Sequence, residues 1–178
     1  MDLDGTKSHA LVEEALGVLD NLDHRGARGA EESTGDGAGI LIQKPHAFFS
    51  GVVSGLGAPD TYGVGQFFLP PDRAVGQALR DFVDRRVAAE GFETIAWRDV
   101  PTDASDLGPT ALATEPDVWQ LFVRPTEPVA PEQLDAQLYI LRRLIENDVA
   151  DSDLKNSEIF YVCSLDRRKI VYKGLLTN

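Results

Sequence analysis

Cysteine, methionine and long apolar runs are scarce in this sequence of 178 residues, which has one cysteine, Cys163, and one methionine. A single cysteine cannot form a disulfide within the chain, which agrees with a reducing compartment. No apolar run approaches the roughly 20 residues needed to cross a bilayer. The acidic start of the chain lacks the basic and apolar parts of a secretion signal. We therefore expect a cytoplasmic protein without a membrane-spanning segment.

Basic residues are also few. The chain has 17 Lys and Arg residues against 29 Asp and Glu residues, and its formal net charge is −12. Nucleic-acid binding needs a clustered cationic surface, so this composition argues against it. Asp outnumbers Glu 18 to 11, and Arg outnumbers Lys 12 to 5. This balance predicts the surface of a halophilic protein, and an acidic mesophilic protein is the alternative.

Glycine, by contrast, is concentrated in one segment. Five glycines fall within fourteen residues, a density that predicts positive φ angles or close backbone approach. The segment follows a predicted helix and precedes the apolar run at 40–42. Nucleotide-binding loops instead leave a strand and open a helix, so this order argues against a phosphate site. The five residues are Gly26, Gly29, Gly35, Gly37 and Gly39.

Apolar periodicity predicts an α+β protein in which helices pack on sheets. The run at 39–43 is continuous, which predicts a strand buried on both faces. Residues 99–117 have no period and are expected to form a surface loop. The last two strands are expected to form a hairpin that turns at Asp166 and Arg167. The predicted helices are 8–22, 45–53, 71–90 and 131–149, and the predicted strands are 39–43, 61–69, 92–98, 118–124, 159–165 and 170–173.

Few residues have the side chains of a metal site or a nucleophile. His24, Asp36 and His46 could supply metal ligands, but they lack the i, i+4 spacing of a helical site and have no cysteine nearby. The sequence therefore predicts no metal site. Cys163 lies within an apolar strand pattern, and no histidine follows it in the chain. Because a buried cysteine behaves as a small hydrophobic residue, we expect a structural role for it rather than nucleophilic catalysis.

Several motifs together resemble one family. Asn-Leu-Asp-His-Arg-Gly-Ala at 21–27, Thr-Gly-Asp-Gly-Ala-Gly-Ile-Leu at 34–41 and Pro-His-Ala-Phe-Phe at 45–49 closely resemble the start of the type 2 glutamine amidotransferase domain of the glutamate synthase large subunit. Trp-Arg-Asp-Val-Pro at 97–101 and Phe-Tyr-Val-Cys-Ser-Leu at 160–165 are also similar to that domain, in its order. Nearly the whole chain is covered, so we expect residues 1–178 to form a partial domain of this type.

The resemblance implies the N-terminal nucleophile hydrolase fold, in which two antiparallel sheets lie between helices, here as a partial αββα sandwich. In that family, a cysteine at the start of the mature chain attacks the glutamine amide, and its own α-amino group acts as the base. An Asn-Gly pair forms the oxyanion hole, and an arginine holds the substrate carboxylate. The ammonia then passes to a distant flavin-containing site, where it aminates 2-oxoglutarate to glutamate.

The residues that carry this chemistry are missing from the sequence. No cysteine stands at the start, and the chain ends before the segments that carry the arginine and the Asn-Gly pair. We therefore expect no catalytic residue in this chain, an internal position for Met1 in a longer reading frame, and a fragment that is inactive alone. The resemblance instead implies a pocket-supporting role for His24, Arg25, Gly26, Thr34, Gly35, Asp36, Gly37 and Gly39.

The resemblance also implies partners. These are the remainder of the large subunit, in cis or in trans, and glutamine as the substrate of the parent enzyme. We expect no cofactor in this chain, because the flavin and the iron–sulfur cluster belong to the rest of the parent enzyme. The alternative is a non-catalytic α+β module that retains the scaffold and serves in binding or interaction.

Overall fold

The computed structural model describes residues 5–21, 37–154 and 157–174. The chain divides into two compact units. The first unit comprises the described parts of 1–43, 103–115 and 171–178, and the second comprises those of 44–102 and 116–170. Both units contain helices and strands, and the α+β class predicted from the sequence is confirmed.

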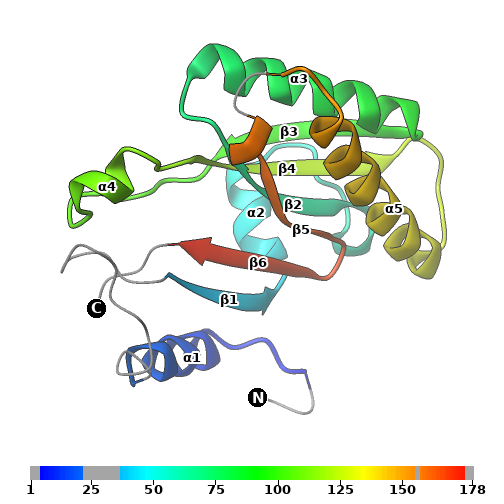
Figure 1. The fold of residues 1–178 in the computed structure, drawn as a ribbon. Helices are drawn as coiled ribbons and strands as arrows, with labels where there is room; N and C mark the ends of the chain where they lie inside the picture. The colour runs from blue at the N-terminus through cyan, green and yellow to red at the C-terminus, as the bar shows by residue number, and fades with distance from the viewer. Residues whose placement is uncertain (1–4, 22–36, 155–156, 175–178) are drawn as a thin grey trace. The chain divides into compact units, whose positions relative to one another are not determined.

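The second unit is built on a four-stranded sheet with the strand order β3-β4-β2-β5 (Figure 1). All three strand pairs are antiparallel. The predicted strands at these places are confirmed, and each boundary lies within two residues of its prediction. The strands are β2 (Gly63–Leu69), β3 (Phe92–Asp99), β4 (Asp117–Pro125) and β5 (Tyr161–Asp166).

Helix α3 (Arg73–Ala89) covers part of one face of this sheet (Figure 1). It begins two residues later than predicted, because the side chain of Asp72 caps it by accepting hydrogen bonds from the backbone N–H groups of Ala74 and Val75, at 2.8 and 3.1 Å. It ends before Gly91, whose φ of +76° lies in the left-handed region that stops helices. The cap and the stop therefore define this helix locally.

Helix α5 (Pro131–Ala150) packs on the same face and fills the centre of the core. The four apolar positions that predicted this helix are all buried, and Val149 extends the same stripe by one turn. Its side chains meet Phe67 of β2 and Leu121 of β4 in the main apolar cluster. The four predicted positions are Leu134, Leu138, Leu141 and Ile145.

Short elements connect the strands of the second unit. Helix α2 (His46–Val52) confirms the helix predicted at 45–53. Its Phe49 side chain is buried in the core, where the ring packs edge-on against that of Phe122 with the two ring centres 5.0 Å apart. The single-turn helices η2 (Pro59–Thr61) and η3 (Ser157–Ile159) precede β2 and β5. Both are too short to leave a periodic pattern in the sequence.

The first unit contains helix α1 (His9–Asn21), strand β1 (Ala38–Gln43) and helix α4 (Pro109–Leu112). The prediction of a helix at 8–22 is confirmed over the described residues. Residues 99–117, predicted as a loop, contain α4 as their only regular helix among the described residues, and its four residues are too few for periodicity to reveal. None of the described helices is both long and apolar enough to cross a membrane.

Strand β1 corrects one prediction. It pairs with β6 (Lys169–Gly174) in a two-stranded sheet, and burial alternates along it instead of being continuous. Leu41 in the middle of the run is 59% exposed. Successive side chains of a strand point to opposite faces of its sheet. The described residues do not cover both faces of this two-stranded sheet, so every second residue of β1 is exposed. The prediction that β1 is buried on both faces was therefore wrong.

The last two strands correct a second prediction. A tight turn joins β5 to β6, and the Asp166 carboxylate accepts hydrogen bonds from the backbone N–H groups of Arg168 and Lys169, at 2.6 and 2.9 Å. The two strands nevertheless do not form a hairpin, because β5 pairs with β2 and β6 pairs with β1. The turn signal in the sequence was correct, but pairing with strands distant in the sequence replaced local pairing.

Gly63→Ala is expected to destabilise the second unit. A Cβ atom at position 63 would lie 2.6 and 2.7 Å from the two Cδ atoms of Leu138, so α5 or the Leu138 side chain would have to shift. Overpacking of this kind costs about 1–3 kcal/mol, which urea unfolding would measure. The matched control is Gly51→Ala in α2, where an added Cβ meets nothing within 4 Å. Equal stability of both variants would contradict the close contact between β2 and α5.

Candidate functional site

The glycine-rich segment is the site predicted from the sequence, and most of it lies outside the described residues. Only Gly37 and Gly39 of the predicted pocket residues are described. The supporting roles of the other six therefore remain predictions. These six are His24, Arg25, Gly26, Thr34, Gly35 and Asp36.

Gly37 and Gly39 both occupy positions that favour glycine. Gly37 has a φ of +86°, a conformation that other residues rarely adopt. A Cβ atom at position 39 would lie 3.0 Å from the backbone oxygen of Tyr172 and 3.3 Å from Cγ of Lys173, both in β6. The end of the glycine-rich segment thus has a left-handed residue that leads into β1 and a close contact with β6. These are the backbone features that the glycine density predicts.

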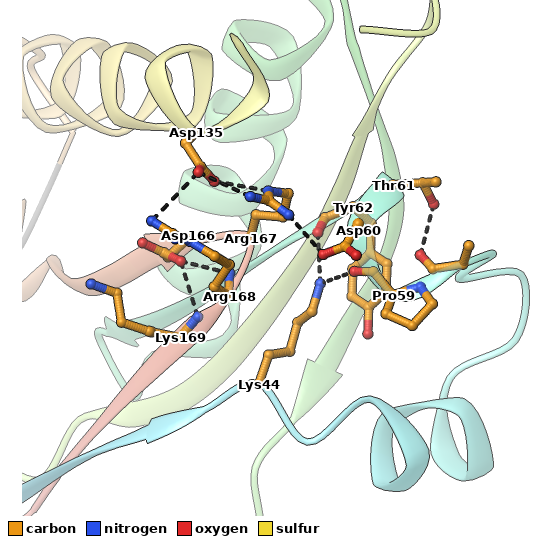
Figure 2. A network of polar contacts seen from close by, with 11 residues as sticks. Lys44, Pro59, Asp60, Thr61, Tyr62, Asp135, Asp166, Arg167, Arg168 and Lys169 are labelled. Carbon is orange, nitrogen blue, oxygen red and sulfur yellow. Dashed lines mark hydrogen bonds and ion pairs between the residues drawn. The ribbon is translucent and has the colours of Figure 1, made fainter. Parts of the chain in front are cut away.

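Lys44 follows β1 directly and is only 3% exposed. Its ammonium group donates hydrogen bonds to the backbone oxygens of Pro59 and Tyr62, at 2.6 and 2.8 Å (Figure 2). Its Nζ atom also lies 3.5 Å from the centre of the Tyr62 ring. Carbonyl dipoles and the aromatic face together compensate for the water that this cation loses on burial. The contact fixes the start of α2 against the turn before β2.

Tyr62 is completely buried, and its hydroxyl oxygen lies 3.1 Å from Nδ1 of His46. Burial disfavours the phenolate and raises the pKa of Tyr62 to about 12. The other ring nitrogen of His46 lies 3.3 Å from the Ser50 hydroxyl. Both nitrogens of His46 therefore have partners from the protein, and the described residues include no group of three potential metal ligands. His24 and Asp36, the other two candidate ligands, lie outside the described residues.

Arg167 is the centre of a second polar cluster (Figure 2), and its side chain is only 9% exposed. It binds Asp135 of α5 through two parallel hydrogen bonds of 2.9 and 3.0 Å, and it donates a third, of 2.7 Å, to Asp60. These hydrogen bonds lower the pKa of Asp135, and they raise that of Arg167. The backbone oxygen of neighbouring Arg168 accepts a 2.6 Å hydrogen bond from the Lys44 N–H group.

From the sequence, Arg167 was expected only to lie in a turn, with no functional role. Its partners Asp60 and Asp135 are separated from it by 107 and 32 residues, so no local pattern could have indicated the cluster. The signal available in the sequence was a run of three basic residues, 167–169, which lies at the turn between two apolar strands of an acidic chain. The described contacts of Arg167 join the turn after β5 to α5 and η2, and they stabilise the buried charge of its guanidinium.

Cys163 is 5% exposed within β5, which confirms the predicted burial. The register between β2 and β5 shifts beside it, because Gln66 faces Ser164 while Phe67 faces Val162. Cys163 therefore occupies the extra position of a β-bulge. A thiol buried at such a position supports the structural role predicted for it rather than attack on a substrate.

Asp135→Asn is expected to lower stability at neutral pH and to have less effect in acid. The pKa of Asp135 is lower in the folded state than in the unfolded state, so its stabilisation is present above the unfolded-state value and is lost as pH falls through the folded-state value. Hydrogen bonds to charged groups contribute about 1.5–3 kcal/mol, so the substitution should cost about that much at pH 7.

Urea unfolding at pH 7 and at pH 3 would measure both effects. The matched control is Asp60→Asn, because the Asp60 side chain contacts the same guanidinium but is 69% exposed. Exposed ion pairs contribute up to about 1 kcal/mol, so this control should change stability less. An Asp135→Asn effect that is as large at pH 3 as at pH 7 would disprove the ionic origin of the stabilisation.

Tyr62 should titrate above the ordinary pH range of a tyrosine. Its pKa in the folded state is about 12, above the ordinary value of 10.0. The neutral phenol is therefore favoured by folding, and this contribution is fully present below the unfolded-state pKa and is lost as pH rises toward 12. Absorbance titration should show one late phenol that disappears in Tyr62→Phe. Identical titration curves for the unmodified chain and Tyr62→Phe above about pH 11 would contradict this expectation.

Comparison with known proteins gives a family for the whole chain. The family model for class-II glutamine amidotransferases matches residues 1–178. The large chain of glutamate synthase [NADPH] from Azospirillum brasilense is 39% identical over 177 residues, which cover 97% of this chain and 12% of the relative. The chloroplastic ferredoxin-dependent glutamate synthase of Spinacia oleracea is 37% identical over 181 residues, which cover 99% of this chain and 11% of the relative.

A third relative is the glutamate synthase [NADPH] large chain of Bacillus subtilis, which is 34% identical over 178 residues, or 98% of this chain and 11% of the relative. The chain thus spans about a ninth of the length of the curated relatives that it matches. The motifs at 21–27, 34–41 and 160–165 had indicated the same family, and that prediction is confirmed. This chain belongs to the class-II glutamine amidotransferase family.

Proposed function

We propose that these residues form part of the glutaminase domain of a glutamate synthase large subunit. Such a domain hydrolyses glutamine and supplies ammonia for the formation of glutamate from 2-oxoglutarate. The observation that carries this proposal is the similarity to glutamate synthase large chains over at least 97% of this chain. The matched relatives include NADPH-dependent and ferredoxin-dependent proteins, so the same region accompanies either electron donor.

The proposal assigns a supporting role to this chain. A class-II amidotransferase needs a cysteine whose own α-amino group acts as the base, and Cys163 is instead buried within β5. The proposal therefore assigns the nucleophile, the arginine that binds the substrate carboxylate and the Asn-Gly oxyanion pair to other segments of the parent subunit. The flavin and the iron–sulfur cluster are assigned there as well.

The described residues support this role through backbone geometry. Gly37 and Gly39 determine how the glycine-rich segment enters β1, and that segment carries the six pocket residues proposed from the resemblance. The bidentate contact between Arg167 and Asp135 fixes the turn between β5 and β6 against α5. In this proposal each contact fixes the backbone of its own unit, and the reacting groups lie elsewhere in a cytoplasmic enzyme.

Ammonia release from glutamine tests the proposal. We expect the 178-residue chain alone to release no ammonia, and we expect release when a cysteine-led segment and the remaining glutaminase segments of a glutamate synthase large subunit are supplied in cis or in trans. In that active assembly, Cys163→Ser should leave the rate of release essentially unchanged, because Cys163 is a buried residue of β5. Glutamine hydrolysis by the isolated chain would overturn the assignment of the nucleophile.

A further inference from the structure

Arg98 lies on the face of the four-stranded sheet opposite α3 and α5. Its neighbour Trp97 points to the helix-covered face and donates a 3.0 Å hydrogen bond to Asp84 of α3. Successive side chains in a strand point to opposite faces, so Arg98 points away from these helices. Its Nη1 group donates a 2.8 Å hydrogen bond to Oε1 of Gln120 in β4, the strand beside it.

A buried row of amides holds Arg98 in place. Gln120 and Gln66 are 0% and 1% exposed, and Nε2 of Gln120 donates a 3.0 Å hydrogen bond to Oε1 of Gln66. The strand register places Arg98 opposite Gln120, and Gln120 opposite Gln66. Each hydrogen bond in the row orients and polarises the next one. The amide oxygen of Gln120 therefore faces the cation, Gln66 holds the Gln120 amide in that orientation, and the guanidinium has a defined position.

Among the described residues, Arg98 has no carboxylate partner, unlike Arg86 and Arg167. Arg86 and Arg167 both form ion pairs with aspartates. Within residues 5–21, 37–154 and 157–174, no carboxylate forms an ion pair with Arg98. A guanidinium has five N–H donors arranged in a fork that matches a carboxylate, and the contact with Gln120 uses one of them. Because Arg98 is partly buried, its charge is less screened than that of a fully exposed arginine.

An apolar surface lies beside this cation. The guanidinium centre is 5.4 Å from the centre of the Phe48 ring in α2. Phe48 is 50% exposed, and so is Val52 one helical turn further along. Large side chains that are half exposed four residues apart form a continuous apolar strip on a helix. A positioned cation beside such a strip suits a ligand that has one carboxylate and a short apolar tail.

We propose that Arg98 and Phe48 form a binding site for a small aliphatic carboxylate. The carboxylate accepts hydrogen bonds from guanidinium N–H groups of Arg98 that have no partner among the described residues, and the aliphatic tail packs on the Phe48 ring toward Val52. The amide row keeps the guanidinium oriented when the site is empty. This site uses none of the residues assigned to the glutaminase pocket, and it stands independently of the proposed function.

Thermal unfolding of the 178-residue chain in sodium butyrate, formate or chloride at equal ionic strength tests this site. A ligand at tenfold excess over its Kd should raise the midpoint of a chain of this size by about 3–6 °C. We expect that rise with butyrate, a smaller one with formate because it has no tail, and none with chloride. Arg98→Gln should abolish the response to butyrate.

The matched control is Arg85→Gln. Arg85 lies over the Phe82 ring at 5.5 Å, on the opposite face of the sheet, and should bind no carboxylate in this way. This variant should keep the full response to butyrate. A response that is equal in the unmodified chain and in Arg98→Gln, or no response beyond that to chloride, would overturn the proposal.

Nuclear magnetic resonance provides a second test that needs no substitution at Arg98. In the unmodified chain, butyrate should shift the Nε–H resonance of Arg98 with saturation, and it should shift that of Arg85 far less. This measurement decides the matter if Arg98→Gln does not fold. Equal, non-saturating shifts of both resonances would show general ion association and would also overturn the proposal.

Discussion

The close contact between β2 and α5 is the constraint on which the second unit depends. Gly63 has no Cβ atom, and the Leu138 side chain occupies the space where that atom would lie. Residues from both elements then form one apolar cluster with Leu121 of β4 and Val83 of α3. Because interiors are packed at crystal-like density, the missing methyl group sets how near the helix lies to the sheet. The packing of α5 on the sheet depends on that separation.

Buried charge gives this unit its specific connections. Lys44 and Arg167 are each less than 10% exposed, and each is surrounded by oxygen atoms from segments far away in the sequence. Burying such cations costs free energy unless their hydrogen-bonding groups are satisfied, so these contacts define a geometry more than they add net stability. Figure 2 shows that both clusters involve the turn around Pro59 to Tyr62. That turn thereby connects the starts of α2 and β2 with the end of β5.

The polar row from Arg98 through Gln120 to Gln66 differs from these two clusters. Its members come from three adjacent strands, and its cation forms no ion pair within the described residues. Amides buried in a sheet are tolerated because each one meets a partner across the strands. The same arrangement keeps the guanidinium in one orientation, which lowers the entropy lost when an anion binds to it. The hydrogen bonds that satisfy the buried amides of Gln120 and Gln66 therefore also hold the Arg98 guanidinium in an orientation that suits anion binding.

The sequence by itself determined the family, the α+β class and nearly every element. The helix at 131–149 was predicted because Leu134, Leu138, Leu141 and Ile145 recur at helical spacing, which is a local property. The family was identified because Gly37 and Gly39 belong to motifs whose residues are adjacent in the chain. The short helices α4 and η2 were not predicted from the sequence, because a single helical turn has no repeating pattern of apolar residues.

Only the tertiary structure decided how distant segments combine. The run at 40–42 suggested a doubly buried strand, yet Leu41 is exposed because β1 pairs only with β6. The turn at Asp166 suggested a hairpin, yet its two strands joined different sheets. Asp135, Asp60 and Gln120 acquired partners 22 to 107 residues away. Strand pairing and buried hydrogen bonds depend on distance in space, and a local sequence pattern does not contain that information.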